Sequence, residues 1–282
     1  EIKSRKGKWK TTPTPAFAKK RLIYQDGQNP FEEGTARFAP TEKKPEKAFA
    51  QWIPHIPETG EYAVYVTYQT LPGSVSDAKY LVFHKGGVTE FLVNQQIGGG
   101  TWVYLGTFEF DKGTNDYGMV VLSNESRQKG VVCADAVRWG GGMGNIARGG
   151  TTSGLPRYLE GARYAAQWSG FPYPVYSPSE GKNDYTDDIN ARSRVINYLS
   201  GNSVYNPKEK GLGVPFEMTL GVHSDAGFSK EDELIGTLGI YTTDYNNGEL
   251  NAGISRYASR DLADMVLTGL QRDISARFGI RW

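Results

Sequence analysis

The residues best suited to chemistry are three polar side chains at the end of an apolar run. His223, Ser224 and Asp225 directly follow the run Phe216–Val222, which we expect to form a short buried strand, and Gly227 begins a turn. A strand that delivers a histidine and an aspartate to its carboxyl end commonly presents a metal ligand or a catalytic base in an α/β sheet. The alternative is a capped strand end, where Ser224 and Asp225 make turn hydrogen bonds. The motif alone does not decide between the two.

Composition and charge exclude several classes of protein. The chain has 282 residues and a formal net charge of +1, so its charge favours neither nucleic acid nor an anionic membrane as a partner. Basic residues gather locally between Lys3 and Arg21, which we interpret as a solvated leader. The single cysteine, Cys133, excludes a disulfide within one chain and a cysteine-based zinc site, and its apolar neighbours indicate a core position. No apolar run approaches the ~20 residues that a membrane span requires.

The first half of the chain has the pattern of an all-β domain. Residues 1–48 are interrupted by prolines and are predicted to be irregular. Apolar segments then recur at intervals of roughly 10 residues, with glycine-rich turns between them. The predicted strands are Ala48–Trp52, Glu61–Tyr68, Ala78–His84, Val88–Asn94, Thr101–Phe110, Gly118–Ser123 and Val131–Trp139. This spacing predicts a β-sandwich over residues 1–140.

A glycine-rich stretch follows. Residues 141–154 contain few large apolar side chains, so they are predicted to form an interdomain linker. A phosphate-binding loop is the alternative, but a dinucleotide fingerprint needs a helix that opens on its last glycine, and Pro156 comes soon after this one.

The second half changes to a helical period. It contains three predicted helices and two predicted strands: helices Arg157–Gly170, Asp187–Ser200 and Ser255–Phe278, and strands Phe216–Val222 and Thr237–Thr242. This order predicts α/β layer packing over residues 155–282. The fold class is therefore mixed, with a jelly-roll-like β-sandwich followed by an α/β domain.

The β-rich segment resembles a known module. The stretches AFAQWIPHIPETGEYAVYVTY, YLVFHKGGVTEFLVNQQIGGGTWVYLGTFEF, VVLSN and VVCADAVRW follow one another over residues 45–140. Together they resemble the golvesin-like β-sandwich module that is associated with xanthan lyases. The resemblance implies an accessory domain of secreted or cell-envelope proteins, with no catalytic residues to carry over. His55 and His84 lie in this segment and are interpreted as structural or exposed.

The second half resembles the central part of the zinc-dependent N-acetylmuramoyl-L-alanine amidases. The pieces that carry this resemblance are ARSRVIN, LGVHSDA, GTLGIY and SRDLADMVLTGLQRDI, in that order. The resemblance implies that His223 ligates zinc and that Asp225, Ser224 and Arg192 lie near the metal or the substrate. It also suggests Glu160 as a second zinc ligand, although a surface carboxylate at a helix start is the alternative.

The amidase part is predicted to be incomplete. A catalytic zinc site needs three protein ligands and an open position for water. The resemblance implies that the remaining histidine ligand lies upstream of Glu1 and that the catalytic glutamate lies beyond Trp282.

Three functions are compatible with these patterns. The first is a hydrolase in which zinc-activated water cleaves the amide of peptidoglycan. The second is a glycan-binding scaffold, in which the aromatic residues Trp52, Tyr65, Trp102 and Tyr104 face the sugar rather than the core. The third is a xanthan-type polysaccharide lyase. The predicted partner is peptidoglycan or another cell-surface glycan, and the resemblances imply a periplasmic, cell-surface or secreted location.

Overall fold

The structure is a computed structural model. It describes residues 2–4, 9–43, 48–201, 207–216, 218–222, 236–250 and 252–279. The chain divides into two compact units, Glu1–Met218 and Thr219–Trp282.

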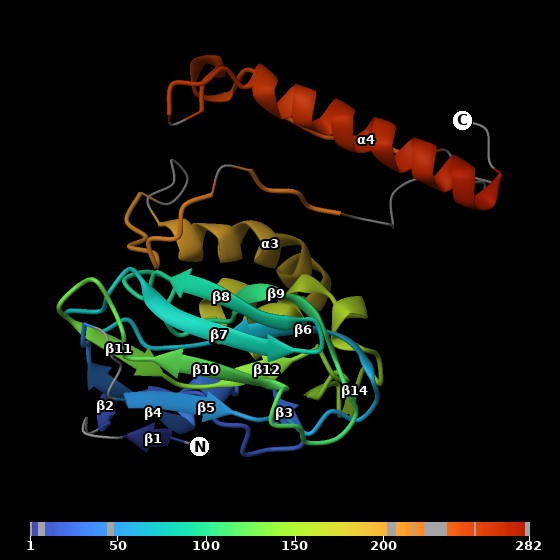
Figure 1. Cartoon of the computed structure of the whole chain (residues 1–282). Coiled ribbons are helices and arrows are strands. Elements are labelled where there is room, and N and C mark those ends of the chain that lie inside the picture. The colour runs from blue at the N-terminus through green and yellow to red at the C-terminus, as the bar shows by residue number, and fades with distance from the viewer. Residues whose placement is uncertain are drawn as a thin grey trace. The chain divides into compact units, whose positions relative to one another are not determined.

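The first unit is built mainly from β-sheets (Figure 1). The largest sheet has the order β1 (Ile2–Ser4), β5 (Ala48–Trp52), β10 (Met119–Ser123), β7 (Ala78–His84) and β8 (Gly87–Val93). A second sheet has the order β12 (Val137–Trp139), β6 (Gly60–Val66) and β9 (Val103–Phe110). A third has the order β11 (Val131–Ala134), β4 (Gly34–Pro40) and β2 (Lys10–Ala16), and a fourth the order β14 (Thr151–Thr152), β13 (Ile146–Arg148) and β3 (Tyr24–Gln25).

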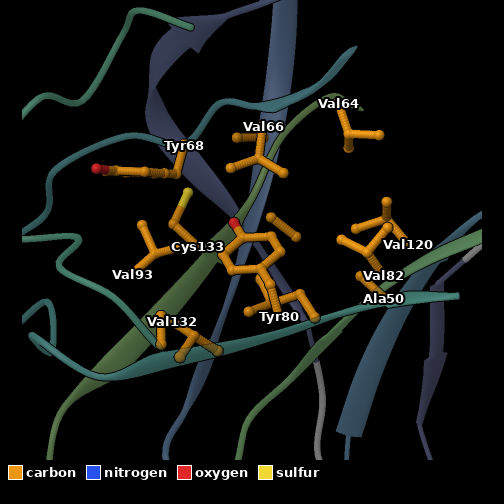
Figure 2. Close-up of a cluster of buried hydrophobic side chains, with 14 of the residues drawn as sticks. Ala50, Val64, Val66, Tyr68, Tyr80, Val82, Val93, Val120, Val132 and Cys133 are labelled. Carbon is orange, nitrogen blue, oxygen red and sulfur yellow. The ribbon is translucent and has the colours of Figure 1, made fainter. Parts of the chain in front are cut away.

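The first three sheets enclose an apolar core (Figure 2), while Tyr24 and Ile146 of the fourth form a separate cluster with Trp168. In β7 the buried side chains of Ala78, Tyr80 and Val82 alternate with half-buried ones, as the two-residue period of a strand requires. The hydroxyl of Tyr80 accepts a hydrogen bond from Nε2 of Gln95 at 3.1 Å, so its burial leaves no polar group unpaired. Cys133 is fully buried, as predicted. Several sheets around one core are consistent with the predicted β-sandwich.

Residues 1–48 form more regular secondary structure than predicted. Four strands, β1 to β4, fall within residues 1–48. Pro13 and Pro15 lie in β2, which is at the edge of its sheet, and the register shifts between Thr11 and Pro15. Prolines are tolerated on edge strands and at bulges because no neighbour needs their missing N–H group there. The prediction of an irregular segment was therefore wrong for the described residues.

The glycine-rich stretch also contributes to a folded core. Residues 141–154 contain β13 and β14, and Ile146 and Ala147 are buried. Strand β13 pairs in parallel with β3, whose residues lie far upstream in the sequence. A local pattern cannot reveal such a partner, which explains why a linker was predicted.

Helices complete the first unit. The elements are η1 (Pro30–Glu32), η2 (Arg157–Leu159), α1 (Ala162–Trp168), α2 (Tyr173–Tyr176) and α3 (Asp184–Ser200). The side chain of Asn183 accepts a hydrogen bond from the Thr186 N–H and caps the start of α3, and Gly201 ends it. The buried side chains of Ala166, Tyr176 and Ala191 pack these helices together. Helix α3 was thus predicted, whereas the predicted helix Arg157–Gly170 is divided into η2 and α1, and α2 was not predicted.

The second unit departs from the predicted α/β packing. It contains η3 (Tyr245–Gly248) and the long helix α4 (Tyr257–Phe278), which was predicted. The predicted strands Phe216–Val222 and Thr237–Thr242 do not form among their described residues, and Val222 and Ile240 are 73% and 87% exposed. An apolar run becomes a strand only where neighbours complete its hydrogen bonds, and no described segment pairs with either run.

No helix in the described part of the chain has the length and apolar character needed to cross a membrane.

Candidate functional site

A row of aromatic and cationic side chains crosses the sheet β12-β6-β9. Arg138 on β12 lies opposite Tyr65 on β6, and Tyr65 lies opposite Tyr104 on β9. The ring centroids of the two tyrosines are 5.2 Å apart, and the Cζ atom of Arg138 lies 4.0 Å from the Tyr65 centroid. Residues directly opposite each other in neighbouring strands share one face of the sheet. The three side chains therefore form one continuous surface.

A β-bulge creates this row. Val64 is paired with Gly106, but the next residue, Tyr65, is paired with Tyr104, so Leu105 is the extra residue of β9. Without the bulge, Leu105 would lie opposite Tyr65 and Tyr104 would turn to the other face. The bulge therefore decides which side chain of β9 joins the surface.

The row leads into a cavity of about 510 Å³. Trp102 and Arg138 line this cavity, and the Arg138 Cζ atom lies 5.1 Å from the Trp102 ring centroid. The other aromatic walls are Phe17, Trp139 and Trp168, the other cations are Lys19 and Arg157, and the exposed apolar rim consists of Leu22, Ile23 and Met143. We call Tyr65, Trp102, Tyr104, Arg138, Trp139, Arg157 and Trp168 the aromatic–arginine site.

The walls of the cavity are held by ring contacts. Phe17 packs edge-to-face against Trp102 and Trp168, with centroid distances of 4.8 Å and 6.0 Å. The guanidinium of Arg157 lies 3.5 Å above the ring of Trp168. Such contacts are favourable beyond their burial of apolar area and fix the orientation of each ring. The walls are thus positioned before any ligand enters.

The cavity is strongly cationic. The described residues that line it include Lys19, Arg138 and Arg157 but no aspartate or glutamate. Burial, and after it the positive charge of Arg138, lower the pKa of Arg157 to about 10. Burial also lowers the pKa of Arg138. Both groups stay charged at neutral pH, and neither has an ion-pair partner within the described part of the chain.

Several buried donors of the cavity have no protein acceptor. In the described part of the chain these include the indole nitrogens of Trp102, Trp139 and Trp168, Nδ2 of Asn145 and Nε of Arg138. All five residues line the cavity. A buried donor without a partner is costly, so most donors in native proteins are paired. These nitrogens are buried behind the cavity surface, so a ligand rich in oxygen acceptors would meet the cations Lys19, Arg138 and Arg157 that line it.

Glycines make one wall of the cavity. Gly140 and Gly142 line it, and both have a φ of +67°, which side chains other than glycine rarely adopt. The phosphate-loop alternative needs a helix after these glycines, but strand β13 follows them.

Among the predicted metal and substrate residues, the structure describes Glu160 and Arg192. Glu160 ends η2 and accepts a hydrogen bond from Oγ of Ser153 at 2.6 Å. Arg192 lies on α3, where its Nε donates to the carbonyl oxygen of Ile189 at 3.4 Å. Among the described residues, no group of three histidine, cysteine, aspartate or glutamate side chains could hold a metal ion.

His223, Ser224 and Asp225 lie outside the described residues. Their role in zinc binding therefore stays a prediction. The other two histidines have structural contacts: Nε2 of His84 lies 3.0 Å from Oγ1 of Thr89, and Nδ1 of His55 lies 3.2 Å from Oγ1 of Thr114.

Three of the four aromatic residues proposed to face glycan do lie together. Tyr65, Trp102 and Tyr104 belong to the aromatic–arginine site, whereas Trp52 packs against the apolar core from β5. Arg138 and Arg157 were not predicted from the sequence. The paired strands bring Arg138 to Tyr65, and no local pattern marks that neighbour.

Asp135 makes the stability of the first unit depend on pH. Its Oδ2 accepts a hydrogen bond from the Phe17 N–H at 3.2 Å, and burial raises the pKa of its carboxyl to about 7. The unfolded carboxyl has a pKa of about 3.9, so the folded state alone holds the proton between these values. The free energy of unfolding should therefore fall as pH rises from about 4 to 7, by up to about 1.4 kcal/mol per pH unit, and level off above.

Denaturant unfolding of the Asp135→Asn variant tests this expectation. Asparagine keeps an acceptor for Phe17 and does not titrate. The wild type should lose stability relative to the variant between pH 5 and pH 8. An equal difference at both pH values would show that Asp135 does not titrate in this range.

Comparison with known proteins identifies the part of the chain that carries most of this site. Residues 25–140 match the family model described as the Golvesin C-terminal domain. Residues 25–140 are similar to this domain, and we call them the golvesin-like module. The module holds Tyr65, Trp102, Tyr104, Arg138 and Trp139, while Arg157 and Trp168 come from residues that follow it. The site is thus completed by helical residues beyond the module.

Relatives that match parts of the chain include two xanthan lyases. A xanthan lyase of Bacillus sp. (strain GL1) is 34% identical over 90 residues, which are 31% of this chain and 10% of that protein. The solved structure of a Paenibacillus xanthan lyase matches with 26% identity and a TM-score of 0.37, over 47% of this chain and 11% of that one. The chain therefore spans only about a tenth of the length of these relatives.

Proposed function

We propose that the chain is a polysaccharide-binding accessory module of a cell-surface or secreted protein. The observation that carries this proposal is the row Tyr104–Tyr65–Arg138 and its continuation into a cavity walled by tryptophans. The apolar C–H faces of a sugar ring pack on aromatic rings, and its hydroxyl groups need nearby donors. The open row offers the first, and the cations Lys19, Arg138 and Arg157 that line the cavity offer the second.

The comparisons support a polysaccharide rather than another aromatic-binding ligand. Both relatives carry the name xanthan lyase, and the matched part is a small fraction of each. An accessory role agrees with this fraction. We extend to this chain only the class of ligand, a cell-surface or secreted polysaccharide.

An exposed tyrosine pair gives a matched test. Tyr104 is 55% exposed and lies in the row, whereas Tyr117 is 54% exposed in a turn of the same module and outside the site. We expect Tyr104→Ala to weaken binding to xanthan about tenfold in affinity electrophoresis, since one stacking contact is worth about 1.4 kcal/mol. Tyr117→Ala should bind as the wild type does. Equal effects of the two substitutions would refute the row as the binding surface.

The amidase hypothesis is a separate proposal about the second half. It rests on the resemblance around His223 and requires zinc ligands in addition to that residue. The aromatic–arginine site neither needs nor supplies a metal ligand. Metal analysis of the purified chain is the measurement that decides whether zinc is bound.

A further inference from the structure

We infer that the aromatic–arginine site recognises a carboxylate on the polysaccharide, so that its ligand is an acidic, uronate-type glycan. This inference rests on the proposed function and narrows it to one chemical class of sugar. Its basis is the position of Arg138, which lies where the open row meets the cavity.

Aromatic rings hold the guanidinium of Arg138 in place. Its Cζ atom lies 4.0 Å from the ring centroid of Tyr65 and 5.1 Å from that of Trp102. It has no ion-pair partner within the described residues, and its Nε is among the buried donors that have no acceptor there. The N–H donors of a guanidinium point outward in its own plane. Carboxylates match this fork with two parallel hydrogen bonds.

Arg157 adds a second charge to the same cavity. It is fixed by hydrogen bonds from Nε to the carbonyl oxygen of Met143 at 3.1 Å and from a terminal nitrogen to Oδ1 of Asn145 at 2.9 Å. Neither partner is anionic. The positive charge of Arg138 lowers the pKa of Arg157, so the two cations repel each other. A bound anion would offset this repulsion.

The surrounding charges do not neutralise this pair. Lys19 is the other charged residue that lines the cavity, and it is also cationic. Glu160 acts on Arg157 through space, but its carboxylate accepts a hydrogen bond from Ser153 and does not line the cavity. The electrostatic potential in the cavity is therefore positive, which favours the binding of an anionic ligand and orients it.

The preference for a charged sugar over a neutral one follows from the burial of the two guanidinium groups. Hydrogen bonds to charged groups contribute more than neutral ones, and a neutral sugar would leave the guanidinium edge with a weaker partner. We therefore expect the site to discriminate a uronate from the corresponding neutral sugar by about tenfold or more. Added salt should reduce this preference, because the cavity is open to solvent at its rim.

Chemical reduction of the polymer's carboxyl groups tests the inference. The full chain is titrated with xanthan, which bears uronates, and with the same polymer after reduction. The wild type should bind the native polymer at least about tenfold more tightly at low salt. Arg138→Gln should lose this preference but retain binding to the reduced polymer. Arg127→Gln removes the same charge from an exposed position of the same module and should keep the preference.

The outcomes separate the two proposals. If the wild type binds both polymers equally, carboxylate recognition is wrong and polysaccharide binding stands. If it binds neither, polysaccharide binding fails as well. A sulfated polymer that competes better than the native one would overturn the assignment to a carboxylate. The comparison of polymers uses the wild type, so it decides the question even if Arg138→Gln does not fold.

Discussion

Replacing Arg163 with methionine should lower the free energy of unfolding by about 3 kcal/mol. The side chain of Arg163 is 1% exposed on α1 and forms ion pairs with Asp26 and Asp184. It also donates a hydrogen bond to Oγ of Ser177 at 2.8 Å. Arg148 joins the same two carboxylates at 3.4 Å and 3.0 Å, which makes a network of two cations and two anions. Removal of Arg163 leaves the two carboxylates to share Arg148 and takes a donor from Ser177, which is more damaging than the loss of an exposed pair.

A surface ion pair in the same unit provides the control. Arg21 pairs with Glu33 at 2.8 Å, but its side chain is 50% exposed. Arg21→Met should therefore change the free energy of unfolding by no more than about 1 kcal/mol. Denaturant unfolding of both variants measures the contrast. Equal destabilisation of the two would show that the Arg163 network does not hold the helices to the N-terminal segment.

Replacing Trp102 with alanine should weaken polysaccharide binding by about thirtyfold or more. Trp102 belongs to both parts of the aromatic–arginine site, because it lines the cavity and lies against Arg138. It also packs against Phe17 at 4.8 Å and Phe31 at 5.5 Å, so its loss removes support from the cavity wall. Central aromatic residues of this kind typically contribute at least about 2 kcal/mol to binding.

The matched variant is Trp102→Phe. It keeps an aromatic face for stacking but removes the indole N–H, which has no acceptor in the described structure. Binding should lie between that of the wild type and that of Trp102→Ala. Thermal unfolding of each variant reports whether the fold is retained. If a folded Trp102→Ala variant binds as the wild type does, the cavity is not the binding site.

The sequence predicted elements correctly where the spacing of apolar residues along the chain matches the side chains that are buried in the core. Strand β7 was predicted with its observed bounds, Ala78–His84, because its alternating side chains fit one buried face. Helix α3 was predicted because an apolar stripe precedes Gly201 at its end. The golvesin-like module was recognised for the same reason, since its ordered motifs are strands and turns of this core.

The errors arise where the structure depends on distant partners. Strand β13 forms because Tyr24 and Gln25 pair with it, and β2 tolerates its prolines because it lies at an edge. The exposed runs near Val222 and Ile240 show the converse, since apolar content alone does not make a strand.

The candidate site could be predicted only in part for the same reason. Tyr65, Trp102 and Tyr104 were named because aromatic residues on strands are candidates for glycan contact. Their convergence depends on the bulge at Leu105, and Arg138 enters only through the pairing of β12 with β6. The glycine at position 106, inside a predicted strand, was the one local signal of a bulge.

The most direct test of polysaccharide binding follows the indole N–H resonances during a titration with xanthan oligosaccharides. The chain has six tryptophans, and Trp102, Trp139 and Trp168 line the cavity while Trp52 packs against the core. Single Trp→Phe variants assign each resonance. We predict saturable shifts for the three cavity tryptophans and none for Trp52. A bound oligosaccharide that leaves the three cavity resonances unmoved would contradict the proposed site.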